Sequence, residues 1–215
     1  MNAATENIPN NKRSGLKSLF LMCGLTGGAI FFITYSVFGL ETPNYNMFRE
    51  TISSLELVRH GWIQQVNFIF FGILNIGFAI ALAEALEQNW YARVIVFLQA
   101  LSGIALIGDG FFIYEPMHLV CDLVTFNSSL LVLFLFTRPF SRNPSWRGWI
   151  VYSILTAITM MLFLTAFGIA NKNHGLAGLY ERLAVLPRSI WSIILAGKLL
   201  RGKKLVNRPP EHVST

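Results

Sequence analysis

Charged residues are scarce in this chain. Asp, Glu, Lys and Arg make up 13% of the 215 residues, against about 25% in an average soluble domain. Hydrophobic residues make up 53%, the mean hydropathy is +0.52, and the apolar residues are spread along the chain instead of forming one terminal anchor. This composition argues against a soluble protein and favours one domain that crosses a membrane several times.

Cysteine is also rare. Cys23 and Cys121 are the two cysteines, and both lie inside apolar runs of the sequence. A free thiol in such a run behaves as a small hydrophobic side chain. We therefore expect two free thiols and no disulfide framework.

Several motifs that typically mark enzymes and transporters are missing. The glycine-rich segment 24–28 lacks the lysine of a phosphate-binding loop and lies mid-membrane, so it predicts a helix-packing surface. The sequence has no His-x-x-x-His pair and no cysteine-rich signature of a metal centre. Ser53 and Ser54 are adjacent serines, and such a pair is too common to indicate a catalytic nucleophile. The sequence also shows no inverted repeat of the kind found in secondary transporters. We predict neither a cofactor nor a resident metal.

Six apolar runs are long enough to cross about 30 Å of hydrocarbon as helices. They lack the alternation of barrel strands, and helices satisfy every backbone group within the segment. The first run exceeds the apolar core of a cleaved signal peptide, and no A-x-A-like site follows it. The sequence predicts an all-α integral membrane bundle of six transmembrane helices, with spans at about 17–40, 62–85, 91–112, 118–136, 149–170 and 176–200.

These spans form one predicted transmembrane domain, 17–200, between a cytoplasmic N-terminal tail, 1–16, and a cytoplasmic C-terminal tail, 201–215. The orientation follows from the basic residues that flank the spans, since cytoplasmic loops carry an excess of Lys and Arg. Twelve such residues fall on the side of the termini: Lys12, Arg13, Lys17, Arg93, Arg138, Arg142, Arg147, Lys198, Arg201, Lys203, Lys204 and Arg208. Three fall on the other side: Arg49, Arg59 and Lys172.

The net charge of +6 is explained by this membrane topology. Because the basic residues cluster just outside the apolar runs, we expect membrane lipid as a partner and no nucleic acid. The predicted location is the bacterial plasma membrane.

Polar side chains line up on three of the predicted helices. At 100° per residue, each set falls on one face of its helix, and each set begins at the outer end. The three sets are Gln64, Asn67 and Asn75; His118, Asp122, Thr125 and Ser129; and Glu181, Arg188 and Ser192.

The third span also ends at the outer side, with Asp109 between two glycines. Ionisable side chains at membrane depth usually face the interior of a bundle. We therefore predict an outward-facing polar cavity whose candidate ligand-binding residues are Gln64, Asn67, Asp109, His118, Asp122, Glu181 and Arg188.

His118 and Asp122 are spaced i, i+4, which suits metal coordination or an acid/base pair. A third ligand could come from His174, His60 or Asp109. A pair in the first turn of a membrane helix, however, more often hydrogen-bonds locally near the interface.

Glu181, together with Arg182 or Arg188, suits binding of a polar headgroup. Opposite charges at membrane depth more often neutralise one another and fix helix packing. Asn67, Asn75 and Gln99 suit hydrogen bonds between helices as well as ligand contacts.

A family resemblance rests on four elements. They are Ile-Ser-Ser-Leu at 52–55, the second helix with Asn67 and Gly72, the turn 108–118, and Gly-Leu-Tyr-Glu-Arg-Leu at 178–183. On these motifs the chain resembles the bacterial and archaeal domain-of-unknown-function family 998. The resemblance covers about residues 17–200 and implies a six-helix membrane protein of unassigned activity. Glu56 departs from the small residue that often follows the first motif.

Three functions remain open at this stage. The first is a protein that binds or moves a small amphipathic or lipid-derived ligand through the outward cavity. The second is an intramembrane lipid-directed hydrolase, metal-dependent or acid/base, that uses His118, Asp122 and Asp109. The third is a structural or accessory bundle.

Overall fold

The computed structural model describes residues 10–173 and 175–205, and within them it contains helices but no strand. Six of the helices are long and apolar enough to cross a membrane. They are α1 (Asn10–Glu41), α2 (Trp62–Ala85), α3 (Trp90–Phe111), α4 (Met117–Leu135), α6 (Arg147–Lys172) and α7 (Ala177–Leu200). Shorter elements are η1 (Ser53–Leu57), α5 (Thr137–Ser141) and η2 (Pro144–Trp146). The predicted fold class is confirmed.

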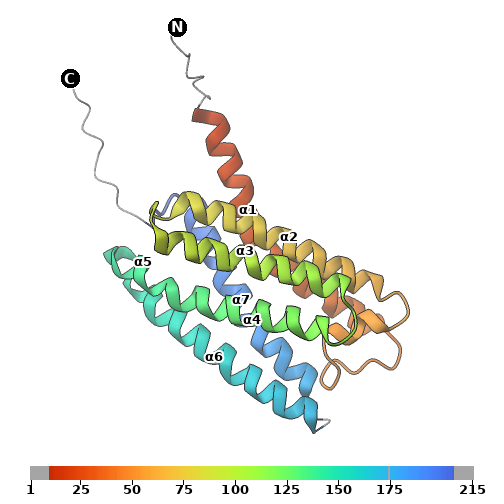
Figure 1. The fold of residues 1–215 in the computed structure, drawn as a ribbon. Helices are drawn as coiled ribbons and strands as arrows, with labels where there is room; N and C mark the ends of the chain where they lie inside the picture. Colours follow the sequence, from red (N-terminus) through yellow and green to blue (C-terminus); the bar gives the residue numbers. More distant parts are fainter. Residues whose placement is uncertain (1–9, 174, 206–215) are drawn as a thin grey trace, which may run out of the picture.

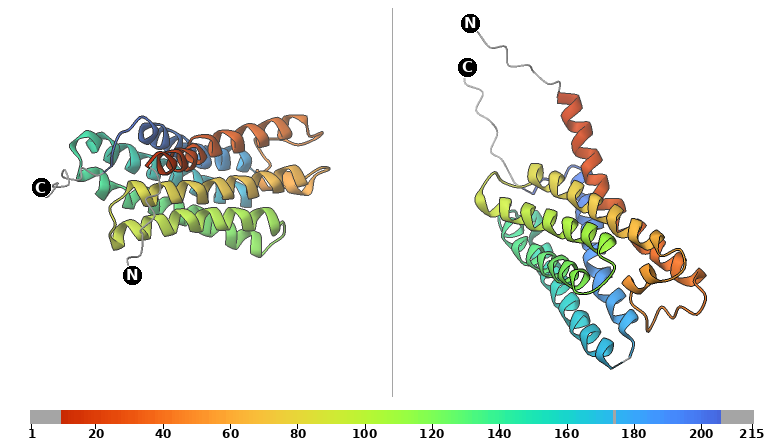
Figure 2. Two further views of the ribbon diagram at one scale, coloured as in Figure 1. Left: turned by 90° about the horizontal axis from the view of Figure 1, so that it is seen from above. Right: turned by 45° about the vertical axis from the view of Figure 1, so that its right-hand side comes forward.

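The six long helices close into a ring. Each packs against the next in the order α1, α2, α3, α4, α6 and α7, and α7 returns to pack against α1. Figure 1 and the two views of Figure 2 show the helices running roughly along one axis, while the first turns of α1 extend beyond the bundle. Because α1 completes this ring, the first span is a structural part of the bundle.

Large apolar side chains cover the outside of this ring. Ile33 on α1, Phe97 on α3 and Leu162 on α6 are 60%, 62% and 65% exposed. Apolar patches of this extent on a soluble protein would mark an interaction surface, and here they match the lipid contact of six spanning helices. The chain is an integral membrane protein.

Helix boundaries agree with the sequence to within a few residues, with two differences. α2 has the predicted bounds, but α1 already begins at Asn10, before the predicted start near 17. The second difference is α5, a short helix after the fourth span that the sequence did not predict. Residues 1–9 and 206–215 of the predicted tails, and His174, lie outside the described residues.

Glycines let α2 and α3 approach closely. A Cβ added at Gly72 would lie 2.5 Å from the carbonyl oxygen of Gly103, and one added at Gly103 would lie 2.7 Å from that of Gly72. Only hydrogen fits between the two backbones here, which is the packing that small residues permit in membrane helices.

An aromatic cluster closes the end of the bundle at which α4 meets α5. Phe136, Phe140, Trp146 and Trp191 are at most 1% exposed, and Trp149 packs against them. The ring centroids of Phe140 and Trp146 are 5.4 Å apart in a stacked arrangement. A core of this kind leaves little room for water at that end.

At the opposite end, the long loop between α1 and α2 is tied to the start of α7. The Leu179 N–H donates to the Phe48 carbonyl at 2.9 Å, and the Arg182 guanidinium donates to the Tyr45 hydroxyl at 2.6 Å and the Glu50 carbonyl at 3.0 Å. The Arg182 guanidinium thus binds the loop, which lies across this end of the ring (Figure 1).

Candidate functional site

A cavity lies inside the ring, and all six long helices contribute to its wall. It holds about 790 Å³ of space between atoms, part of which is open to solvent. Ligand sites of small molecules usually combine apolar walls with a few polar groups. The polar lining residues are Asn75, Ser102, Asp122, Thr125, Ser129, Glu181, Arg188, Ser189 and Ser192.

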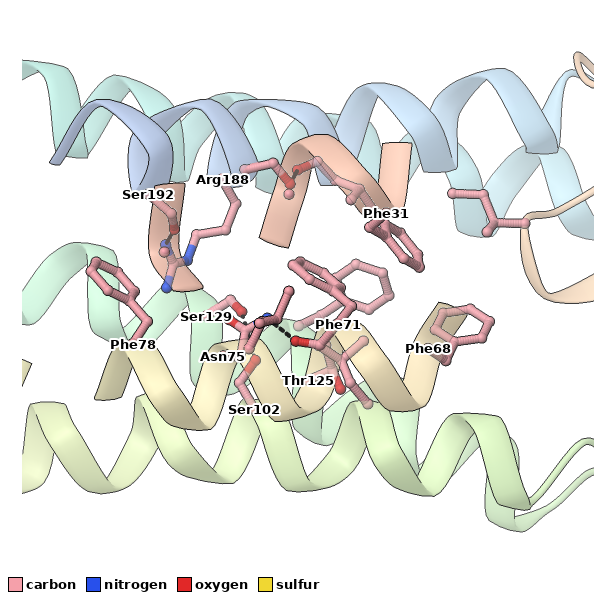
Figure 3. A pocket seen from close by; sticks show the side chains of 18 of the residues that line it. Phe31, Phe68, Phe71, Asn75, Phe78, Ser102, Thr125, Ser129, Arg188 and Ser192 are labelled. Carbon is pink, nitrogen blue, oxygen red and sulfur yellow. Dashed lines mark hydrogen bonds between the residues drawn. The ribbon is translucent and has the colours of Figure 1, made fainter. Parts of the chain in front are cut away.

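The three predicted polar stripes account for much of this lining. Asn75 of α2, Asp122 and Ser129 of α4, and Arg188 of α7 all border the same space. Figure 3 shows Asn75 and Ser129 on one side of the space, with Arg188 entering from the other. The helical phases read from the sequence therefore match the interior faces of the three helices.

Arg188 is the cation of the cavity and is buried. Its guanidinium donates to the Gln99 side-chain oxygen of α3 and to the Ser192 hydroxyl, while its Nε has no hydrogen-bond partner. Gln99 in turn donates to Asn75 at 2.8 Å. The arginine thus reaches across the ring to neutral acceptors and has no carboxylate within ion-pair distance among the described residues.

Glu181 has a different role from the predicted pairing with Arg188. Its Oε2 accepts a hydrogen bond from the Ile52 backbone N–H at 2.6 Å. The ion pairs of the described chain join other residues, so the expectation that Glu181 and an arginine form a neutralising pair is wrong in this structure. Glu181 instead ties α7 to the loop that precedes η1.

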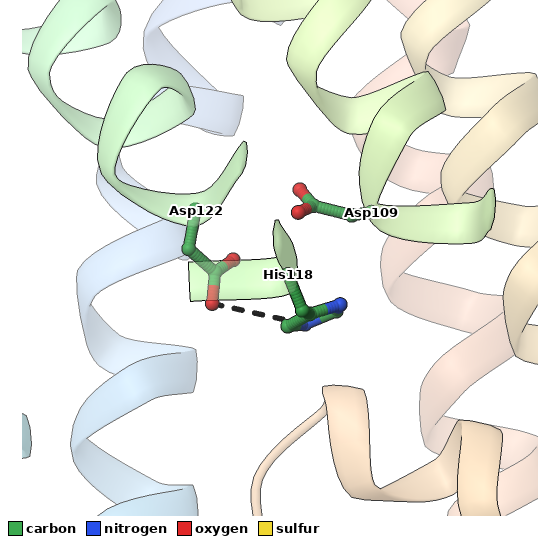
Figure 4. Close-up of side chains that lie close together, drawn as sticks. All are labelled: Asp109, His118 and Asp122. Atoms are coloured by element: carbon green, nitrogen blue, oxygen red, sulfur yellow. Dashed lines mark ion pairs between the residues drawn. The ribbon is translucent and has the colours of Figure 1, made fainter. Parts of the chain in front are cut away.

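Asp109, His118 and Asp122 lie together at the end of the ring nearest η1. The ligand-type atoms of these three side chains all lie within 4.8 Å of one another. Figure 4 shows Asp109 coming from α3 toward the two residues of α4, where His118 Nε2 and Asp122 Oδ2 lie 3.8 Å apart. Asp109 is therefore the third partner among the three that the sequence suggested, and His60 is not part of this group.

Glu56 of η1 joins this cluster, and the sequence did not predict it. Its side chain is 1% exposed, its Oε2 lies 3.7 Å from His118 Nδ1, and neither of its oxygens has a hydrogen-bond partner. Burial raises the pKa of the Glu56 carboxyl to about 8, and the negative charge of Asp122 adds to this shift. The neutral form of Glu56 is therefore favoured unless a cation lies close to the carboxyl group.

Gln64 and Asn67 are buried but support the structure beside the cavity. Asn67 donates to the Phe31 carbonyl of α1 and to the Gln64 side-chain oxygen, both at 3.2 Å. Neither residue borders the cavity. Of the seven candidate residues, the structure places three on the cavity wall: Asp122, Glu181 and Arg188.

Both cysteines are free thiols, as expected from their apolar surroundings. Cys23 borders the cavity on α1, and Cys121 is buried on α4.

Comparison with known protein families matches residues 25–198 to the family described as "Protein of unknown function (DUF998)". Searches among curated proteins and among solved structures found no match. The matched segment contains the whole Asp109, His118 and Asp122 cluster and every residue that lines the cavity except Cys23 and Gly24. Because the match covers most of the 215 residues, the chain belongs to the DUF998 family of membrane proteins of unknown function.

Proposed function

We propose that this protein binds a small amphipathic, lipid-derived ligand in the cavity of the ring. The apolar part of the ligand lies among phenylalanine side chains, and an anionic group contacts Arg188. The single observation that carries the proposal is the state of Arg188, a buried cation that borders the cavity and has neutral partners only.

An arginine inside the membrane is costly and usually has a functional counter-charge. The guanidinium stays protonated and offers five N–H donors. Gln99 and Ser192 accept two hydrogen bonds, and the unpartnered Nε leaves capacity for a further acceptor. A carboxylate or phosphate group would supply both the acceptor and the negative charge.

The apolar wall suits a hydrocarbon chain. Its phenylalanines come from three helices and surround the polar groups on more than one side (Figure 3). They are Phe31, Phe68, Phe71, Phe78 and Phe126. A wall that combines aromatic side chains with polar groups favours an amphipathic ligand with an apolar chain.

The location we propose is the bacterial plasma membrane with both termini in the cytoplasm. The support is the excess of Lys and Arg on the side of the α2–α3 link, the α5 region and the C-terminal end of α7. In this orientation the loop before η1 faces outward, and the aromatic cluster of Phe136 and Trp146 lies at the cytoplasmic end. The ligand would then enter from the outer half of the membrane.

A second candidate is the intramembrane lipid-directed hydrolase. One observation favours it: Asp122 borders the cavity and also contacts His118, which could act as an acid/base partner. In this case the cavity would hold an acyl ester or amide, and the cluster would activate a water molecule against its carbonyl.

The test uses three probes with the same twelve-carbon chain: dodecyl phosphate, dodecanol and dodecyltrimethylammonium. Full-length protein in a neutral maltoside detergent is titrated with each probe while its thermal unfolding is followed. Dodecyl phosphate should stabilise the protein most, because a charge-assisted contact adds about 1.5–3 kcal/mol. The Arg188→Met variant should lose this preference, and Arg201→Met, which changes an exposed arginine at the end of the same helix, should retain it.

Equal stabilisation by all three probes, or a preference that survives Arg188→Met, would contradict the proposal. Absence of any probe effect in folded protein would leave the structural bundle as the better explanation. Hydrolysis of a dodecanoyl 4-nitrophenyl ester that is lost in Asp122→Asn but not in Arg201→Met would favour the hydrolase.

A further inference from the structure

The cluster of Asp109, His118 and Asp122 has the composition of a metal site. Two carboxylates and one imidazole, all with donor atoms within 4.8 Å of one another, point into a common space (Figure 4). Asp109 comes from the last turn of α3, and His118 and Asp122 come from successive turns of α4. Two rigid helices therefore position the three groups.

The second observation is the lack of partners for these buried atoms. Asp109 is 0% exposed, and neither of its carboxylate oxygens accepts a hydrogen bond. His118 Nε2 is also buried without a partner. Leaving one buried polar atom unpaired costs about 1–3 kcal/mol, and more for a charged group, so three such atoms in one place point to a site that binds a ligand.

The hydrogen bond of His118 orients the ring for coordination. Its Nδ1 lies 2.9 Å from the Phe112 carbonyl oxygen, which can only accept, so Nδ1 carries the proton of this bond. The lone pair of the neutral ring is then on Nε2, the atom that lies 3.8 Å from Asp122 Oδ2. Metal-bound histidines usually donate their other N–H to a carbonyl or carboxylate in this way.

The buried carboxyl groups around His118 also favour binding of a cation. Glu56 adds a third buried carboxyl beside His118, on the Nδ1 side of the ring. No Lys or Arg of residues 10–173 or 175–205 forms an ion pair with Glu56, Asp109 or Asp122. Ordered water could satisfy the hydrogen-bonding atoms, but it would not neutralise the carboxylates.

We propose that Asp109, His118 and Asp122 bind one divalent first-row metal ion, Zn²⁺ or Mn²⁺, through two carboxylate oxygens and one imidazole nitrogen. Imidazole favours Zn²⁺ over Mg²⁺ and Ca²⁺, and the oxygen ligands are compatible with Mn²⁺. Donor atoms that each lie about 2.1 Å from a tetrahedral ion are about 3.4 Å from one another. The three donor atoms here lie within 4.8 Å of one another, so small side-chain rotations would bring them to that distance.

Three protein ligands leave a coordination position free for water or another ligand. Asp122 also borders the cavity, so one ligand of the proposed site is part of the cavity wall. Glu56 lies 3.7 Å from His118 Nδ1, so it contacts the ring on the side away from the proposed ligand atom Nε2 and is a positioning residue in this arrangement. The metal site does not depend on Arg188 or on the proposed ligand, so either proposal can fail alone.

The experiment measures metal content and metal binding of the full chain in detergent. Protein is stripped with a chelator, dialysed, and titrated with ZnCl₂, MnCl₂, MgCl₂ and CaCl₂, with bound metal measured by mass spectrometry and unfolding followed in parallel. We expect one Zn²⁺ or Mn²⁺ per chain and a higher unfolding temperature in its presence. Asp109→Asn and His118→Ala should each weaken binding at least about tenfold, the usual effect of disturbing a metal site.

Two control variants change neighbouring residues that are exposed: His60→Ala and Glu115→Gln. Both should bind metal as the unmodified protein does. Asp109→Asn should also unfold at no lower temperature than the metal-stripped protein, since it replaces an unpaired buried carboxyl group by a neutral amide of similar size. This readout shows that the variant is folded and separates loss of metal binding from loss of structure.

Folded protein that binds neither Zn²⁺ nor Mn²⁺ would overturn the proposal. So would binding that persists in both Asp109→Asn and His118→Ala, or binding that is lost in His60→Ala, because each would place the metal elsewhere. Destabilisation of the metal-stripped protein by Asp109→Asn would show that Asp109 is satisfied without a cation, and would also count against the site.

Discussion

Glu181 and Arg188 lie about two turns apart on α7 and are both buried, yet they bind different partners. Glu181 accepts a hydrogen bond from the Ile52 N–H, and Arg188 donates to Gln99 and Ser192. The Glu181 carboxyl therefore holds the loop that precedes η1 against α7, whereas the Arg188 guanidinium borders the cavity and contacts α3. This division separates the packing role of α7 from its proposed binding role.

The first prediction concerns energetic coupling. Residues in direct contact show interaction energies of about 0.5–3 kcal/mol in double-mutant cycles. Arg188→Met and Gln99→Leu should therefore be strongly non-additive in the free energy of unfolding, because each single change leaves a buried partner unpaired. Glu181→Gln and Arg188→Met share no partner and should be coupled more weakly. Unfolding of the single and double variants in detergent micelles measures both cycles, and a larger coupling for the Glu181 cycle would contradict the structure.

The second prediction concerns the close approach of α2 and α3. Gly72→Ala and Gly103→Ala each place a methyl group against the opposite backbone, which cannot move aside as a flexible side chain can. Overpacking of this kind costs about 1–3 kcal/mol, so both variants should unfold at lower temperature.

The matched control is Gly168→Ala on α6, where a Cβ meets nothing within 4 Å. Alanine is favoured over glycine in a helix by up to about 1 kcal/mol, so this variant should be unchanged or slightly more stable. Equal losses in all three variants would mean that the α2–α3 contact is not tight.

The number of spans and the orientation of their polar faces could be predicted from the sequence because both depend on local properties. Span length follows from the thickness of the hydrocarbon layer, and the periodicity of a helix fixes which residues share a face. Asp122, Ser129 and Arg188 illustrate this, since each lies on a polar face read from the sequence and borders the cavity.

Glu56 illustrates what the sequence could not provide. It lies in the longest polar loop, and no periodic pattern shows that η1 folds it against His118. The partner of Arg188 could not be predicted from the sequence either, because Gln99 is on α3 and the contact depends on how the ring closes. Both contacts are tertiary contacts. The one signal in the sequence was Glu56 itself, which departs from the family motif in this loop.

The third prediction concerns topology. Reporter fusions after residues 88, 142 and 205 should report the cytoplasm, and fusions near residues 46 and 173 should report the outside. The reason is the distribution of Lys and Arg between the two sides of the membrane. Paired reporters active on opposite sides provide the internal control at every position. A cytoplasmic signal at residue 46 would reverse the orientation and place the cavity entrance on the inner side.

The fourth prediction tests whether the cavity contains water. Single cysteines at Ser129 and Ser192, which border the cavity, are introduced into a protein that lacks Cys23 and Cys121. Both should react with small water-soluble thiosulfonate reagents in folded protein. A cysteine at Leu133, which is fully buried and does not border the cavity, is the control and should stay protected until the protein is denatured.

The charge of the reagent adds a sharper test of the same cavity. Arg188 donates to Ser192 directly, so its positive charge acts at the reacting thiol in the Ser192→Cys variant. An anionic thiosulfonate should then react about tenfold or more faster than a cationic one of similar size, because a cleft of one charge concentrates the opposite charge. Adding Arg188→Met should remove this difference while both reagents still react. Protection of both cavity positions in folded protein, with labelling only after denaturation, would instead show that the polar faces pack dry against one another, and the proposed ligand site would lose its basis.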